Sequence, residues 1–223
     1  MSANTPQELR KLYAARFEPS REYRRAVWRV LVSEVFSKHI GAQDTVLDLG
    51  CGYGEFINQV RCGRRFAMDL NPDAAEMLEE GVKLLAQDCS APWPLEDNSL
   101  DVVFTSNFFE HLPDKPTLAR TLAQAHRCLR PGGKLLAMGP NIRLVDGAYY
   151  DFWDHHIELT ERSLAEALVL QGFAVEVCLG RFMPYTMSDG RQFPVFFVKL
   201  YLRLPWAWRI FGKQFLVIGR KPA

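Results

Sequence analysis

Three glycines follow an apolar segment that carries an acid, in the stretch Val46-Leu47-Asp48-Leu49-Gly50-Cys51-Gly52-Tyr53-Gly54. Glycine allows positive φ angles and leaves no side chain between the backbone and a bound ligand. A helix that follows such a turn presents free N–H groups to that ligand. The stretch therefore predicts a strand, a tight loop and a helix that together bind a nucleotide-like molecule.

The spacing of these glycines separates two kinds of nucleotide-like ligand. A dinucleotide fingerprint has the form G-x-G-x-x-G, whereas here the third glycine comes one residue earlier. The acid two residues before the first glycine would repel a phosphate and favour a cationic amino-acid group. The stretch from Asp48 to Gly54 resembles the first motif of the class I S-adenosylmethionine-dependent methyltransferases. The resemblance implies S-adenosylmethionine as the cofactor, S-adenosylhomocysteine as its product, and cofactor contacts from Asp48, Gly50, Cys51, Gly52 and Gly54.

Two further acids end the next predicted strands. The segment from Arg65 ends at Asp69, about twenty residues after the glycine turn, where dinucleotide folds bind the ribose hydroxyls. A third strand from Val82 leads to Asp88, and the resemblance places this position near the adenine amino group. Taken singly, these acids also suit a helix N-cap or an ordinary turn. As a series they predict cofactor contacts from Asp69, Leu70, Asp88 and Cys89.

A fourth predicted strand, from Leu100, continues into Asn107-Phe108-Phe109-Glu110-His111. The resembled family often carries a Glu-His pair here that faces the cofactor. The resemblance implies that Asn107 contacts the cofactor and that His111 shapes its methyl-bearing side. A solvated or capping His111 is the alternative, because histidine serves in both packing and polar roles.

The long segment after the fifth predicted strand, residues 140–158, is rich in aromatic residues and acids, and it contains adjacent histidines. It would lie at the carboxyl edge of the sheet, where open α/β folds bind ligands. A hydroxyl acceptor needs a base, and histidine has a suitable pKa. We predict His155 or His156 as this base. A metal site with Asp151 and Asp154 is an alternative, as is an ordinary loop, but adjacent histidines seldom point the same way and we expect no metal.

Length and composition bound the class of protein. The 223 residues are 48% hydrophobic and carry a net charge of +1, which fits a globular protein and gives no reason to expect nucleic acid. The five scattered cysteines lack C-x-x-C spacing, so neither a disulfide framework nor a structural zinc is expected. The chain has no signal-like start and no bilayer-length apolar run, so we expect a cytoplasmic protein.

The order of predicted elements indicates the fold. Strands alternate with helices, which predicts an α/β, Rossmann-like sheet of seven mostly parallel strands with helices on both faces. The resemblance adds a C-terminal antiparallel hairpin. We expect a helical lid over residues 1–43 and a methyltransferase core over 44–223, with a substrate-loop insert at 140–158 and an apolar-basic insert at 191–212.

The acceptor is less clearly indicated than the cofactor. After the fourth strand the chain lacks the prolines of enzymes that methylate base amino groups, so a small molecule is favoured. A looser resemblance to bacterial methyltransferases of polysaccharide assembly makes a sugar hydroxyl the preferred acceptor. A lipid-linked substrate is the alternative, because 193–211 mixes aromatic residues with Lys199 and Arg203. Pro205 interrupts this segment, which favours packing on the protein or an oligomer contact over a membrane. A non-catalytic cofactor-binding protein is a third reading.

Overall fold

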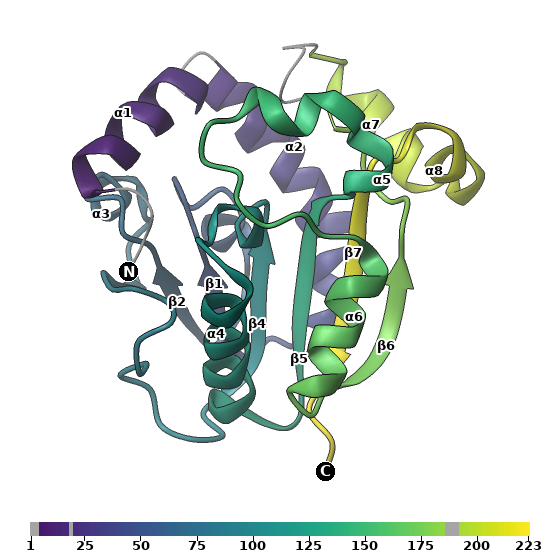
Figure 1. Cartoon of the computed structure of the whole chain (residues 1–223). Helices are drawn as coiled ribbons and strands as arrows, with labels where there is room; N and C mark the ends of the chain where they lie inside the picture. The colour runs from purple at the N-terminus through teal and green to yellow at the C-terminus, as the bar shows by residue number, and fades with distance from the viewer. Residues whose placement is uncertain (1–4, 18–19, 186–191) are drawn as a thin grey trace.

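One sheet organises the molecule (Figure 1). The computed structural model describes residues 5–17, 20–185 and 192–223. Its strands are β1 (Thr45–Leu49), β2 (Arg64–Met68), β3 (Val82–Leu85), β4 (Leu100–Ser106), β5 (Leu129–Pro140), β6 (Ala174–Leu179) and β7 (Gln214–Arg220). They lie in the order β3-β2-β1-β4-β5-β7-β6. Strand β7 is antiparallel to both of its neighbours, and the other pairs are parallel. The predicted seven-stranded sheet with C-terminal antiparallel strands is confirmed.

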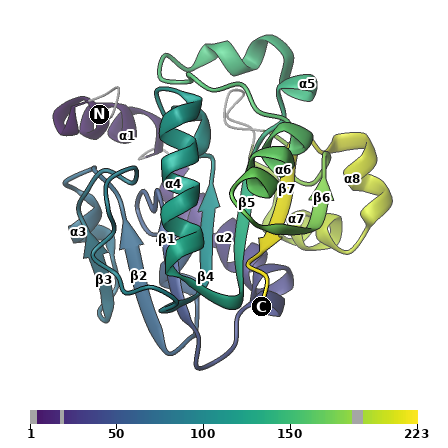
Figure 2. The same cartoon turned by 60° about the horizontal axis from the view of Figure 1, so that its bottom comes forward.

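Helices cover both faces of this sheet. The α-helices are α1 (Pro6–Phe17), α2 (Arg21–Glu34), α3 (Ala74–Met77), α4 (Lys115–Cys128), α5 (Ile142–Val145), α6 (Glu161–Leu170), α7 (Val195–Leu202) and α8 (Pro205–Phe211). Short 3₁₀ turns are η2 (Phe36–His39), η3 (Ile57–Gln59), η4 (Phe109–His111) and η5 (Asp146–Asp151). Helices α4 and α6 lie in front of the sheet and α2 lies behind it, and Figure 2 gives a second view of the same layers.

Two apolar clusters fill the space between the sheet and these helices. Leu47 and Leu49 of β1 join the cluster that contains Leu122 of α4. Val46, which points to the opposite face, joins the cluster that contains Leu31 and other α2 residues. Successive side chains of a strand alternate between faces, so a strand covered on both faces is buried throughout. Every residue of β1 is buried accordingly.

The sequence marks the starts of two long helices. Asp114 accepts a hydrogen bond from the Thr117 N–H at 2.7 Å and caps α4. Thr160 caps α6 by accepting from the Ser163 N–H at 3.1 Å, and Ser163 Oγ accepts from the Thr160 N–H at 2.9 Å. Both are N-caps that satisfy free backbone donors. Thr160 therefore marks the start of α6.

The prediction of a helix directly after the glycine turn is wrong. The chain forms only turns and the short η3 before β2 begins. Asn58 donates to the Met77 carbonyl at 2.9 Å and accepts from the Glu79 N–H at 2.9 Å, so its side chain ties this segment to the next connection. Gly63 then donates to the Asp44 carbonyl at 2.9 Å and returns the chain to the start of β1. In the connection after β2, only α3 is helical.

Helices α7 and α8 form the apolar-basic insert and meet at Pro205, the first residue of α8. Leu202 and Ala207 are buried. Glu34 of α2 forms ion pairs with Lys199 and Arg203 of α7, both at 3.1 Å. The segment therefore packs on the protein through one face, as predicted. No helix within the described ranges is long and apolar enough to cross a bilayer.

Candidate active site

The glycine loop after β1 is held against the end of β2. Gly50 and Cys51 donate to the Met68 carbonyl at 2.9 and 3.1 Å. Gly50 has a φ of +72°, and a Cβ there would lie 2.3 Å from the Phe108 ring, so only glycine fits. Gly54 also has a positive φ, but its added Cβ would meet Asn58 and Leu78 instead. The predicted glycines thus make a tight turn, in which Gly54 serves the packing behind the loop.

Two buried carboxylates flank this loop. Asp69 Oδ2 accepts from the Gly52 N–H and its Oδ1 accepts from the Asn71 N–H, both at 2.8 Å. Burial raises the pKa of Asp69, although these hydrogen bonds oppose the shift. Burial and then the charge of Glu55 raise the pKa of Asp48 well above its usual value. Carboxylates in this setting favour a cationic ligand group, which would offset their desolvation.

A small cavity of about 90 Å³ lies beyond the ends of β2 and β3. Asp69, Leu70, Asp88 and Cys89 all line it, as the sequence predicted for the ribose and adenine. Asp88 accepts from both the N–H and the hydroxyl of Ser90 at 2.8 Å, which fixes its carboxylate at the strand end. These four predicted cofactor residues are therefore brought together around one cavity.

A larger cavity of about 350 Å³ adjoins the first one. Asp48, Gly50, Cys51 and Gly52 line one side of it, and the wall opposite comes from α2 and from the chain after β6. Residues common to both cavities are Tyr13, Arg16 and Asn107. The two cavities thus meet beside Asn107, so a ligand that fills the small one can reach into the large one.

Two buried acceptor atoms of the larger cavity have no hydrogen-bond partner within the described chain. They are Asn107 Oδ1 and Gln214 Oε1. The Asn107 backbone takes a φ of +49° and its N–H donates to the Met138 carbonyl at 2.9 Å, which fixes this residue in the wall. Gln214 Nε2 donates to the Pro184 carbonyl at 2.8 Å. Because a buried acceptor without a partner is costly, both atoms suit a ligand that donates hydrogen bonds.

His111 lines the small cavity and is part of a charged contact with α1. Its Nδ1 lies 3.1 Å from Asp154 Oδ2, and Arg16 holds the same carboxylate through two hydrogen bonds of 2.6 and 3.0 Å. Burial would lower the pKa of His111, but the hydrogen bond to Asp154 and the charges of Glu110 and Asp154 outweigh it and raise the pKa. Burial opposes ionisation of Asp154 too, yet its bonds to His111 and Arg16 lower its pKa.

The two adjacent histidines occupy different environments. His155 is partly buried, stacks on Phe152 at 4.8 Å between ring centroids, and has Nδ1 2.9 Å from the Tyr149 carbonyl oxygen. Burial, followed by the charge of His111, lowers the pKa of His155 to about 3. The His156 side chain is exposed. The backbone N–H of His156 donates to the Glu110 carbonyl at 2.7 Å. In the part of the chain described here, neither residue is among those that line the two cavities. Their role as a base stays a prediction.

Several wall residues were not predicted from the sequence. They come from α1, α2, the chain after β6 and the start of β7, and they include Tyr13, Arg16, Tyr23, Trp28, Met183 and Gln214. Arg16 and Asp154 are 138 positions apart, so no local spacing signals their contact. From the sequence, only a helical lid over residues 1–43 was expected in this part of the chain.

Comparison with known proteins agrees with this geometry. A profile of the methyltransferase domain family matches residues 47–137, from β1 through most of β5. The chain is 33% identical over 150 residues to a Mycolicibacterium smegmatis protein that carries the name S-adenosylmethionine-dependent methyltransferase, covering 65% of this chain and 57% of that protein. It is also 33% identical over 136 residues to the malonyl-[acyl-carrier protein] O-methyltransferase of Dechloromonas aromatica, covering 58% and 50% respectively. The chain thus spans about half the length of these relatives.

A solved structure shows that the similarity of fold extends further. A methyltransferase of Haloferax volcanii, determined in complex with the Trm112 methyltransferase activator, superposes with a TM-score of 0.69. The superposition covers 97% of this chain and 98% of that chain at 20% sequence identity. The glycine loop, the acids at the strand ends and the sheet order agree with this fold and with the match of residues 47–137 to the methyltransferase domain family.

Proposed function

We propose that this protein transfers the methyl group of S-adenosylmethionine to a hydroxyl group of a small molecule, with a sugar or glycan precursor as the preferred acceptor. The observation that carries the proposal is a cavity next to the cofactor motif, lined by Asn107 and Gln214, each of which also has a buried side-chain oxygen without a hydrogen-bond partner in the described chain. A hydroxyl-bearing acceptor can donate to both.

The residues around the smaller cavity suit the cofactor. In this proposal Asp69 accepts hydrogen bonds from the ribose hydroxyls, and Asp88 with Cys89 holds the adenine. Asp48 and the loop from Gly50 to Gly52 face the amino-acid end, where buried acids favour positive charge. When bound, the cofactor supplies an electrophilic methyl carbon: the acceptor oxygen forms a C–O bond to it, the C–S bond breaks, and the electron pair leaves with sulfur as S-adenosylhomocysteine.

The acceptor hydroxyl must also lose a proton. We propose that the neutral ring of His155, rather than His156, accepts a hydrogen bond from this hydroxyl; because burial lowers the pKa of His155 to about 3, it acts as a weak base. Nδ1 of His155 faces the Tyr149 carbonyl at 2.9 Å, so the proton belongs on Nδ1 and Nε2 keeps its lone pair. His111 lies beside it, at 4.8 Å between ring centroids, and lines the cofactor cavity. An in-line displacement otherwise depends mainly on positioning and on exclusion of water, for which the α1 and α2 walls are suited.

A lipid or lipid-linked acceptor is the second candidate, and one observation favours it. Helices α7 and α8, together with Phe193 just before α7, expose large apolar side chains to solvent. The opposite face of the two helices packs on the protein. The exposed side chains are Phe193, Phe196, Phe197, Leu200, Trp206, Ile210 and Phe211. Basic residues lie among them, and the segment 192–213 contains no acid. Such a surface is typical of segments that lie in the membrane interface.

The experiment is an acceptor screen with free sugars, sugar nucleotides and lipid-linked sugars, read out by S-adenosylhomocysteine release and product mass. Gln214→Leu should raise the acceptor KM by about tenfold and leave the affinity for S-adenosylhomocysteine unchanged, because it removes one buried hydrogen-bond acceptor. No turnover with any hydroxyl-bearing acceptor, with turnover on an amine or a thiol, would contradict the proposed acceptor class. A cytoplasmic location stays a prediction.

A further inference from the structure

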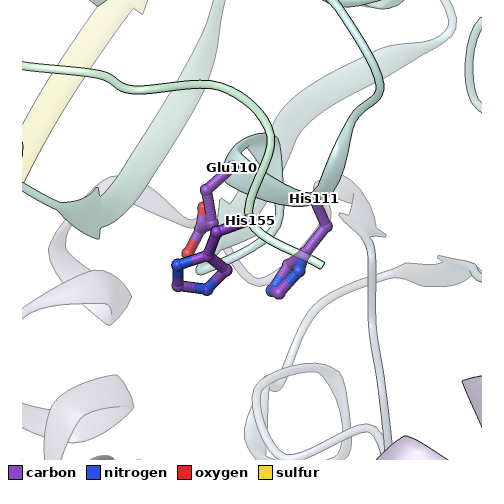
Figure 3. A group of neighbouring side chains, drawn as sticks. All are labelled: Glu110, His111 and His155. Carbon is purple, nitrogen blue, oxygen red and sulfur yellow. The ribbon is translucent and has the colours of Figure 1, made fainter. Parts of the chain in front are cut away.

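Three side chains with metal-binding atoms converge beside the cofactor cavity (Figure 3). Glu110 and His111 belong to η4, and His155 comes from the loop over residues 140–158. One ligand atom of each lies within 4.8 Å of the other two. Two imidazoles and one carboxylate form a donor set that suits several divalent transition metals. We propose that Glu110, His111 and His155 bind a divalent transition-metal ion.

The hydrogen bonds behind the two histidines support this site. His155 Nδ1 lies 2.9 Å from the Tyr149 carbonyl oxygen, and His111 Nδ1 lies 3.1 Å from Asp154 Oδ2. A metal-binding histidine usually donates its second ring N–H to a carbonyl or a carboxylate, which fixes the ring and its tautomer. With Nδ1 of each ring engaged in this way, Nε2 is the nitrogen that each histidine can offer to an ion.

The electrostatic setting also suits a cation. The Glu110 side chain is only 3% exposed. A carboxylate removed from water is costly unless a positive charge compensates it. Arg16 does not supply that charge directly, because its guanidinium holds both carboxylate oxygens of Asp154. Asp154 therefore orients His111, while Glu110 is available to a bound ion.

This assignment differs from the metal site considered from the sequence. That alternative combined Asp151 and Asp154 with both adjacent histidines. Asp154 is instead a partner of Arg16 and His111, and the His156 side chain is exposed. Glu110, which lies 45 positions before His155, takes the place of these acids. The convergence of η4 with the loop, rather than any spacing along the chain, creates the site.

An ion at this position would change how the acceptor is activated. A divalent cation lowers the pKa of an oxygen bound to it, so the hydroxyl would lose its proton more readily without a protein base of its own. This part rests on the proposed methyl transfer. The binding of the ion does not, because it needs neither cofactor nor acceptor.

The test is calorimetric titration of the chelator-treated full chain with Zn²⁺ and with Mn²⁺, without cofactor or acceptor. We expect one ion per chain. Glu110→Gln and His155→Ala should each weaken binding by about tenfold or more. His156→Ala is the matched control, because it removes an adjacent imidazole that is exposed, and it should leave the dissociation constant unchanged. Equal losses in His155→Ala and His156→Ala, or no stoichiometric binding by the wild-type chain, would overturn the site.

A second measurement avoids substitutions that impair folding. In the wild-type protein, substoichiometric Mn²⁺ should broaden the NMR ring resonances of His111 and His155 while those of His39 and His126 stay sharp. Equal broadening of all of them, or none, contradicts the assignment. Because no acceptor is present, failure of this test would leave the proposed methyl transfer standing, whereas failure of the acceptor screen would leave the metal site standing.

Discussion

The cofactor side and the acceptor side of this site are built in different ways. Around the small cavity, the residues predicted to bind the cofactor follow the strands that position them: Asp69 after β2, Asp88 after β3 and Asn107 after β4. Arg16 and Asp154, from distant parts of the chain, complete this wall. Around the large cavity, the wall joins α2, the chain after β6 and Gln214 of β7 to the same strand ends. The first kind of site is local in sequence, and the second depends on long-range packing.

This difference has a consequence for specificity. A motif that lies at strand ends is fixed by the sheet itself, so the cofactor can stay the same while the acceptor wall changes. The acceptor wall includes helices that belong to other parts of the chain, and substitutions in them alter the cavity without touching the glycine loop. Substitutions on the two sides should therefore separate cofactor affinity from turnover.

The largest loss of turnover without a loss of cofactor affinity is expected for a substitution at one of the adjacent histidines. His155→Ala should lower turnover by about 10²–10⁴, because it removes the group at which the hydroxyl is activated. Affinity for S-adenosylhomocysteine, measured by calorimetry, should remain near the wild-type value. His156→Ala serves as the control and should keep near-normal turnover. If both variants remain fully active, activation of the acceptor occurs elsewhere.

On the cofactor side, a substitution is expected to weaken cofactor binding. Asp69→Ala should cost about 2–4 kcal/mol of S-adenosylhomocysteine affinity, since it removes a buried carboxylate that would accept from the ribose. Calorimetric titration measures the loss directly. Asp97→Ala, which removes an exposed acid outside both cavities, is a suitable control. Unchanged binding by the Asp69 variant would refute the cofactor placement.

The difference between the cofactor side and the acceptor side also explains which features could be predicted from the sequence. The strands, their order and the acids at their ends follow from apolar runs that end in turn residues, because such signals are local. The expected helix after Gly54 failed since Asn58 and Gly63 make contacts with distant backbone that no periodicity reveals. The environment of His155 likewise depends on η4 and η5, which meet only in the folded chain.

A smaller effect is expected where α1 meets the loop over residues 140–158. Arg16, which lines both cavities, forms a mostly buried ion pair with Asp154, which lines the small one. A double-mutant cycle with Arg16→Met and Asp154→Asn, measured by urea unfolding, should give a coupling of about 1–3 kcal/mol. Hydrogen exchange should become faster in α1 in either single variant. A coupling near zero would mean that α1 is not held over the site by this pair.

The smallest expected effect is liposome binding by α7 and α8, and it is expected only for a lipid-linked acceptor. If the acceptor is lipid-linked, the exposed aromatic side chains should bind anionic liposomes weakly and in a salt-sensitive manner, because the basic residues add an electrostatic attraction that salt screens. The paired change Trp206→Ser and Phe211→Ser should lower co-sedimentation severalfold without altering S-adenosylhomocysteine affinity. Leu170→Ser, an exposed apolar residue on α6, is the matched control. Absence of co-sedimentation by the wild-type chain at low salt would remove the lipid candidate and leave the free sugar hydroxyl as the acceptor, with this surface then available to a second copy of the chain.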